Sequence, residues 1–262
     1  MAKAMLIDYT RCIGCQQCVA ACKTKNGLLP MEPAEEPSAK SYTGVKQRNG
    51  LFVSRLCMHC QDPTCASVCP VGAFRKTAAG PVVYAKEKCI GCRYCILACP
   101  FDVPKYEWES RAPKVTKCTL CADLVAAGQQ PACVQACPVG ARIFGDRETL
   151  LAEARGRIQA NGKKYVDQVF GADEVGGTSV LLLSSVPFRT LGFRENLGRQ
   201  PLPLLTWRAL SEIPTVVTAG GAMLFGIWWI TNRRTMVAEE RAREEAARRA
   251  AVAPEKEEDE EE

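Results

Sequence analysis

Sixteen cysteines in four groups of four constrain this 262-residue chain more than any other feature. Average protein composition holds far less cysteine, so these residues have a dedicated use. The first and third groups share the spacing C-x2-C-x2-C-x3-C, the second is C-x2-C-x4-C-x3-C, and the fourth is C-x2-C-x11-C-x3-C. In chain order, the four motifs are Cys12, Cys15, Cys18 and Cys22; Cys57, Cys60, Cys65 and Cys69; Cys89, Cys92, Cys95 and Cys99; and Cys118, Cys121, Cys133 and Cys137.

The first and third spacings are those with which bacterial ferredoxins hold [4Fe–4S] clusters. The third motif also has the trailing proline, Pro100, where the first has Lys23. Three thiolates of a motif turn toward one cluster, and the fourth cysteine, which we expect to open a short helix, ligates the other cluster of a pair. Gly14 and Gly91 lie in the loops, where the missing Cβ lets backbone amides approach the sulfurs.

Two other uses of cysteine are alternatives to clusters. A disulfide framework is typical of short secreted chains. Zinc binds C-x2-C pairs, although zinc sites seldom add a third close cysteine and a trailing Cys-Pro. Four repeated motifs that use every cysteine favour four [4Fe–4S] clusters over both.

Charge and histidine content narrow the function further. Residues 1–238 carry 29 basic and 18 acidic residues, net +11, within a chain of net charge +5. Such a basic region is typical of nucleic-acid binding. An oxidised cluster with four thiolates carries roughly −2, however, so four clusters offset most of this charge. We expect no nucleic-acid partner, and the single histidine, His59, excludes centres built from several histidines.

Internal repeats indicate two ferredoxin-like dicluster modules, fused or interleaved. Cys12-Ile-Gly-Cys15 recurs as Cys89-Ile-Gly-Cys92, and Cys69-Pro-Val-Gly-Ala recurs as Cys137-Pro-Val-Gly-Ala.

Over about residues 5–187 the chain resembles the four-cluster electron-transfer (beta) subunits of membrane oxidoreductases, most closely those of hydrogenase 2 and formate dehydrogenase N. The order of the motifs carries this resemblance, together with three segments: Cys57-Met-His-Cys60-Gln-Asp-Pro-Thr-Cys65, Cys89 through Pro104-Lys105-Tyr106, and Gly176-Gly177-Thr178-Ser179-Val180 to Val186-Pro187.

In that family the motifs pair first with fourth and second with third. The resemblance implies four clusters with these ligands: Cys12, Cys15, Cys18 and Cys137; Cys118, Cys121, Cys133 and Cys22; Cys57, Cys60, Cys65 and Cys99; and Cys89, Cys92, Cys95 and Cys69. It also implies that the first-motif cluster faces a catalytic subunit, and that the cluster at the other end lies nearest a membrane partner.

We expect a non-catalytic subunit, because the sequence has no dinucleotide-binding glycine motif after a strand, no P-loop and no spare thiol. It would conduct electrons between a large catalytic subunit (molybdenum or tungsten, or nickel–iron) and an integral membrane cytochrome b or quinone-binding subunit. The alternatives are the beta subunit of a polysulfide or dimethyl sulfoxide-type reductase, and a free-standing membrane ferredoxin.

The expected fold class is α+β, with two dicluster modules related by pseudo-twofold symmetry and one C-terminal transmembrane helix. The domains are a cluster domain over 1–145 with an insertion at 23–56, a partner-contacting extension over 146–212, the transmembrane helix at 213–231, and a charged helix with an acidic tail over 232–262. In the extension we expect a helix N-capped by Asp146 and ending near Ala160, a strand from Val180 to Leu183, and a loop from Pro187 to Pro203.

Ile213 to Ile230 contains no charge and is long enough to cross a bilayer as a short helix, with Pro214 in its first turn. Trp207 and Trp228-Trp229 suit the two interfaces, and a buried core helix is the alternative. Six arginines follow the segment and three precede it, which favours a cytoplasmic C-terminus and an extracytoplasmic cluster domain. The start of the chain shows no signal peptide, so the domain would cross with a partner.

Four other residues near the motifs have plain interpretations. His59 is expected to pack or hydrogen-bond beside its cluster rather than ligate it. Lys105, Tyr106 and Trp108 are expected to form a surface or an interface after the third motif.

Overall fold

The computed structural model describes residues 2–29 and 33–252. The acidic tail predicted from residue 255 onward lies outside these residues. The chain forms two compact units, Met1–Thr206 and Trp207–Glu262, which are described separately below.

A three-stranded sheet organises the first unit, in the order β8-β1-β9. Strand β1 (Lys3–Asp8) pairs antiparallel with β8 (Arg142–Asp146) and parallel with β9 (Val180–Leu183), which is the strand expected there. The sheet therefore joins the start of the chain to the segment after the last cysteine. All four motifs lie in the sequence between β1 and β8, which are neighbours in the sheet.

Both faces of this sheet are buried, and successive side chains alternate between two cores. Met5 and Ile7 of β1 pack with Cys18 and Cys118 in one core. Ala4 and Leu6 pack in the other, which is completed by the apolar stripe of helix α6. A strand that is apolar on both faces has no solvent side. The sheet is thus a wall between the cysteine motifs and α6.

Helix α6 (Arg147–Ala160) follows the predicted span and buries the predicted stripe of Leu150, Leu151, Ala154 and Ile158. The prediction of a side-chain cap was wrong. Asp146 occupies the N-cap position but makes no capping hydrogen bond. Its carboxylate instead accepts a hydrogen bond from the Lys3 ammonium at 3.0 Å, which fastens the helix start to β1.

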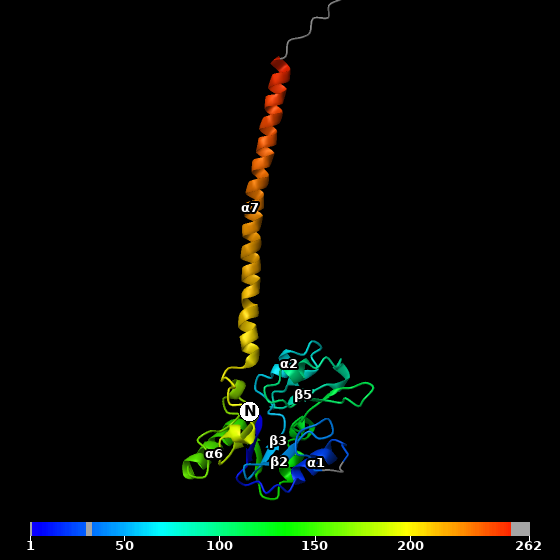
Figure 1. Cartoon of the computed structure of the whole chain (residues 1–262), viewed down its shortest axis with the longest axis vertical. Coiled ribbons are helices and arrows are strands. Elements are labelled where there is room, and N and C mark those ends of the chain that lie inside the picture. The colour runs from blue at the N-terminus through cyan, green and yellow to red at the C-terminus, as the bar shows by residue number, and fades with distance from the viewer. Residues whose placement is uncertain (1, 30–32, 253–262) are drawn as a thin grey trace, which may run out of the picture. The chain divides into compact units, whose positions relative to one another are not determined.

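The motifs lie on short elements (Figure 1). α2 and β5 belong to one lobe of the first unit, whereas α1, β2 and β3 belong to the other. Hairpins pair β2 with β3, β4 with β5 and β6 with β7. The elements are α1 (Gln17–Lys25), β2 (Gly44–Arg48), β3 (Leu51–Arg55), α2 (Thr64–Ser67), β4 (Phe74–Lys76), β5 (Val82–Tyr84), η1 (Lys86–Lys88), α3 (Tyr94–Leu97), β6 (Lys105–Tyr106), β7 (Val115–Thr116), α4 (Ala122–Ala126), α5 (Ala132–Gln135), η2 (Glu174–Gly176) and η3 (Phe188–Leu191).

The second unit consists of helix α7 (Leu202–Val252), which begins in the last residues of the first. Its apolar and charged halves are continuous, as predicted. The helix starts earlier than expected, however, so Pro214 lies inside it rather than in its first turn. Membrane helices tolerate interior proline because neighbouring groups satisfy the freed backbone atoms. α7 is the one helix among the described residues that is long and apolar enough to cross a membrane.

The sheet's second core should contribute substantially to the stability of the first unit. Leu181 of β9 is fully buried in it, whereas Leu29 is 71% exposed. We expect Leu181→Ala to destabilise the unit by about 2–5 kcal/mol, since it deletes buried methyl groups and leaves a cavity. A fall in the thermal unfolding midpoint of the detergent-solubilised chain measures this. Leu29→Ala is the control, and equal midpoints for the two variants would contradict the packing described here.

Candidate functional site: four cysteine-lined centres

One backbone device recurs in all four motifs, immediately before the second cysteine. Gly14, His59, Gly91 and Leu120 each have a positive φ, between 50° and 74°. This left-handed conformation turns the backbone N–H inward, so that Gly91 N donates to Cys89 Sγ at 3.4 Å and Leu120 N donates to Cys118 Sγ at 3.3 Å. Glycine adopts the conformation freely, whereas His59 and Leu120 adopt it at a cost. Such N–H···S bonds tune the potential of a bound cluster.

The short helices join the third cysteine of each motif to the fourth. Cys18 is the second residue of α1, and the equivalent cysteines are the second residues of α2, α3 and α5. The expectation that the fourth cysteine opens the helix was therefore wrong, because it lies one turn further on. Four-residue spacing places both thiols on the same side of the helix but one turn apart. Each helix thus presents its two cysteines to two neighbouring centres.

Three small cavities are lined by four cysteines each. The identical sets of thiols suit one kind of occupant. In that order the cavities are lined by Cys12, Cys15, Cys18 and Cys137; by Cys22, Cys118, Cys121 and Cys133; and by Cys57, Cys60, Cys65 and Cys99.

The remaining four cysteines meet at a fourth centre. Burial raises the pKa of the Cys95 thiol to about 12, and Cys89, Cys92 and Cys69 add to the effect. The structure therefore brings together each set of four that the family resemblance implies. All sixteen cysteines are free thiols, so none of them forms a disulfide.

Burial and crowding hold many of these thiols in the neutral form. Burial raises the pKa of Cys22 and of Cys65 to about 12, and the neighbouring thiols of the same centre raise it further. Cys89 differs: burial alone would raise its pKa, but the Tyr84 hydroxyl and the N–H of Gly91 outweigh burial and lower it. A metal ligand must be a thiolate, so loading these centres releases protons and supplies the missing positive charge.

Neighbouring centres can be ordered from the thiols that influence one another. Burial and the thiols of its own centre raise the pKa of Cys22, and Cys18 of the first centre raises it further. Cys118 is affected by burial, by Cys22 and then by Cys57 of the second motif. The pKa of Cys65 includes a contribution from Cys95 of the third motif. Cys57 also packs against the core that contains Cys118, and Cys65 packs against the core that contains Cys95, so the centres follow the order first, fourth, second and third motif.

The chemistry of the lining fits anionic clusters, because buried cations face it. Arg142 lines the first cavity and is 4% exposed, and its Nη1 has no hydrogen-bond partner among the described residues. Lys117 lines the cavity of the second motif and is equally buried. Burial alone would lower the pKa of Arg142, but the neighbouring Cys133 and Cys18 side chains, with a hydrogen bond to Cys133, outweigh it and raise that pKa. Cations this deep need a nearby anion.

Sequence reasoning missed both cations as site residues, although it expected counter-charge of this kind. Arg142 begins β8 directly after Cys137-Pro-Val-Gly-Ala, and Lys117 precedes Cys118. Adjacency to a cysteine motif was the available signal.

His59 is fully buried and acts as a hydrogen-bond acceptor, in line with the predicted non-ligand role. Its Nδ1 accepts the N–H of Val82 at 2.9 Å, which assigns the imidazole proton to Nε2. Burial, followed by the charges of Lys117 and Lys76, holds the pKa of His59 well below its usual value. The side chain is therefore neutral.

The third-motif centre lies closest to an exposed apolar surface. Tyr106 reaches the loop, where its hydroxyl donates to the Gly91 carbonyl at 3.4 Å. Trp108 packs edge-on against Tyr106 and remains 70% exposed. Lys105 pairs with Asp102 at 3.2 Å. These residues form the surface that the sequence predicted.

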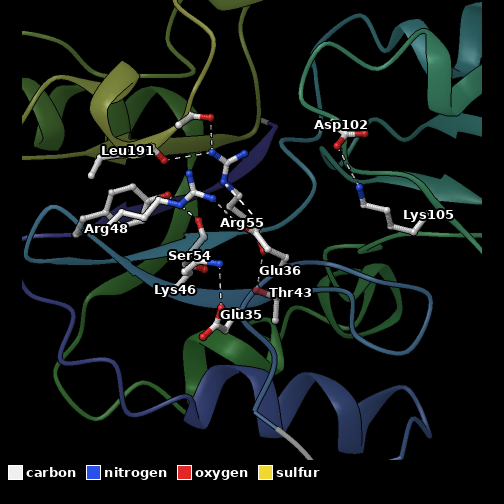
Figure 2. A network of polar contacts seen from close by, with 12 residues as sticks. Glu35, Glu36, Thr43, Lys46, Arg48, Ser54, Arg55, Asp102, Lys105 and Leu191 are labelled. Carbon is white, nitrogen blue, oxygen red and sulfur yellow. Dashed lines mark hydrogen bonds and ion pairs between the residues drawn. The ribbon is translucent and has the colours of Figure 1, made fainter.

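A basic cleft lies beside the second-motif cavity, with which it shares Met58, Phe101 and other lining residues. Its arginines are largely engaged within the chain (Figure 2). Arg48 pairs with Glu36 at 2.8 Å, and Arg55 donates to the Leu191 carbonyl and lies over the Phe193 ring at 4.6 Å. The cleft therefore fastens the β2–β3 hairpin to the segment after η3.

Comparison with known proteins gives two family matches, both described as a 4Fe-4S dicluster domain, over residues 11–73 and 48–147. A protein of Nitratidesulfovibrio vulgaris is 40% identical over 246 residues, covering 87% of this chain and 66% of the relative. The hydrogenase-2 operon protein HybA of Escherichia coli O157:H7 is 36% identical over 254 residues, covering 79% and 76%. The iron-sulfur subunit of nitrate-inducible formate dehydrogenase of Escherichia coli K12 is 39% identical over 198 residues, covering 68% and 66%.

These alignments span about two thirds to three quarters of the relatives' lengths. Two dicluster domains and sixteen cysteines fit four [4Fe–4S] clusters. The chain belongs to the family of ferredoxin-type iron–sulfur electron-transfer subunits that includes HybA and the formate dehydrogenase iron-sulfur subunits.

Proposed function

We propose that this chain is the electron-conducting, non-catalytic subunit of a membrane oxidoreductase. Four [4Fe–4S] clusters would be held by the four sets of cysteines described above. The observation that carries the proposal is that each set combines three cysteines of one motif with one of another, while neighbouring sets interact in a single row. Each cluster accepts and releases one electron at a time, so the row is a conductor.

The two ends of the row are the points where partners would connect. Only Cys15 and Cys92 are exposed among the sixteen cysteines, and they belong to the first and third motifs. Ile13 is exposed beside Cys15, whereas the third motif has four exposed apolar side chains around it: Ile90, Tyr94, Leu97 and Trp108. Contiguous exposed apolar side chains mark interaction surfaces. We assign the third-motif end to an apolar membrane subunit and the first-motif end to the catalytic subunit.

The partners follow from the relatives. By their names, the relatives belong to a hydrogenase-2 operon and to formate dehydrogenases. We propose a large partner that oxidises formate or hydrogen, with a molybdenum, tungsten or nickel–iron centre. A cytochrome b or quinone-binding subunit would accept the electrons.

Pseudo-twofold symmetry of the two modules belongs to the same proposal. α1 packs against α5, and α2 packs against α3, so each pair of helices joins two centres. The left-handed position recurs in all four loops. These features support two equivalent modules, one formed by the first and fourth motifs and the other by the second and third, within a cluster domain over 1–145.

We further propose that α7 anchors the chain with a single pass over residues 213–231, placing the C-terminus in the cytoplasm and the cluster domain outside. The apolar side chains of this part of α7 are exposed, as lipid contact requires. Arg233 lies over the Trp229 ring at 5.9 Å, at the end where the apolar segment meets the charged one. Residues 146–212 would form the partner-contacting extension.

Metal content tests the cluster assignment directly. Protein purified without oxygen should contain about sixteen iron atoms and equal acid-labile sulfide per chain, four for each cluster. Iron near zero, or zinc in its place, would overturn the proposal.

Double cysteine variants test the pairing of the motifs. Cys12→Ser and Cys137→Ser should damage the same cluster, so the double variant should lose no more iron than the more affected single variant. Cys12→Ser with Cys22→Ser should damage two clusters, and the losses should add. Cys22 is the matched control because it shares helix α1 with Cys18 of the first centre. Additive losses in both pairs would contradict the proposed ligand sets.

A charge placed in the apolar half of α7 tests membrane anchoring. Leu224→Arg should weaken insertion by about 3 kcal/mol and release chain into the soluble fraction after carbonate extraction. Ala242→Arg, in the charged half of the same helix, should leave retention unchanged. Equal retention of the two variants would argue against a spanning helix, and protease accessibility in right-side-out spheroplasts tests the orientation.

Co-purification distinguishes an electron-conducting subunit of a complex from a free-standing electron carrier. Solubilised membranes should yield this chain together with a large metal-containing subunit and a membrane subunit. Leu97→Glu, within the apolar third-motif surface, should lose the membrane subunit and retain the large one. Isolation of the wild-type chain alone with its clusters intact would favour a membrane ferredoxin.

A further inference from the structure

Arg142 is a buried cation that forms no ion pair with a carboxylate among the described residues. The ion pairs among the described residues do not include it. Its Nη2 donates to the Ser54 hydroxyl, and its Nη1 is buried with no partner in the described chain. A guanidinium stays charged at any accessible pH. The fold therefore keeps one full positive charge in its interior that the protein itself does not neutralise with an acid.

The position of this charge is shared by two centres. Arg142 lines the cavity of Cys12, Cys15, Cys18 and Cys137. It also lies near Cys133, which lines the next cavity in the row, because β8, which begins at Arg142, packs against α5, which carries Cys133. These two centres belong to one module, whose helices α1 and α5 pack together. A single side chain thus acts on both members of a cluster pair.

The internal repeat shows that the other module is built differently at this point. Cys137-Pro-Val-Gly-Ala is followed by Arg142, which begins β8, whereas Cys69-Pro-Val-Gly-Ala is followed by Phe74, which begins β4. The cation near Phe74 is Lys117, whose Nζ lies 5.9 Å from the ring centre. Lys117 donates to the carbonyls of Val82 and Cys118, so its charge is partly satisfied by backbone. At this position of the repeat, a guanidinium with one buried, unpartnered nitrogen is present in the first module and absent from the described residues of the second.

This inference rests on the cluster row proposed above. We propose that the Arg142 guanidinium is the shared counter-charge of the first- and fourth-motif clusters and holds the reduction potentials of both above the values they would have without it. Reduction adds one electron to a cluster, drawn from a low-potential donor, and breaks no bond. A nearby buried cation stabilises the added negative charge, which favours the reduced state.

The test is a redox titration of the full-length, detergent-solubilised chain followed by electron paramagnetic resonance, with dithionite as reductant. In Arg142→Met and Arg142→Gln, two of the four midpoint potentials should fall by at least about 59 mV. At a fixed solution potential, this shift lowers the ratio of reduced to oxidised cluster tenfold. The other two should not move. Arg142→Lys keeps the charge, so its potentials should lie closer to those of the wild type.

Arg55→Gln is the matched control. Arg55 follows Ser54 in β3 and also has a buried nitrogen without a hydrogen-bond partner, but its charge is met by the Glu36 carboxylate at 3.9 Å and by the carbonyls of Leu191 and Gly192. The cluster potentials of the Arg55→Gln protein should equal those of the wild type. Unchanged potentials in a fully loaded Arg142→Met or Arg142→Gln protein would overturn the inference, as would an equal fall in all four clusters.

Iron content keeps the test decisive if the neutral variants fail to load. Loss of iron in Arg142→Met and Arg142→Gln with full loading in Arg142→Lys supports a counter-charge. Loss of iron in Arg142→Lys as well shows a packing role and overturns the inference. Wild-type protein without iron would instead refute the proposed function, so the two failures are distinguishable.

Discussion

The four-residue spacing between the third and fourth cysteines of each motif is the constraint on which the rest of the structure depends. The two thiols stand one helical turn apart and line different centres, so each pair of cysteines holds two centres side by side. Cys18 and Cys22 on α1 face the first and fourth centres, and Cys137, just after α5, and Cys133, on α5, face the same two centres from the other side. The helices therefore fix the distance between neighbouring clusters.

Charge is the second constraint, because the motifs bring many thiols into the interior. The raised pKa of Cys22 and Cys65 means that an unloaded centre holds protons, and that iron must replace them. The negative charge that remains on the loaded clusters is offset by the buried side chains of Arg142 and Lys117, and not by surface lysines alone. The net charge of +11 over residues 1–238 is thus partly an internal requirement of the fold.

Sequence spacing predicts the chemistry well because ligand geometry is local. In the first and third motifs, three cysteines within seven residues and a glycine at the left-handed position define the loop before any tertiary contact forms. The same reasoning predicted α6 and β9, since their apolar patterns are long or fully buried. It failed at Asp146, where a tertiary ion pair with Lys3 competes with the helix cap. It also placed the start of α7 too late, because Arg208 and Glu212 interrupt the uncharged run before Ile213, whereas the helix continues through both.

The pairing of motifs could not be obtained from spacing, and the reason is topological. β1 precedes the first motif and β8 follows the fourth, and their antiparallel pairing brings the two outer motifs together. The inner motifs are left to pair with each other. A contact between residues 3 and 146 leaves no periodic trace in the sequence. The sheet that contains no ligand therefore decides which cysteines share a centre, and it places Arg142, the first residue of β8, in the lining of the first centre.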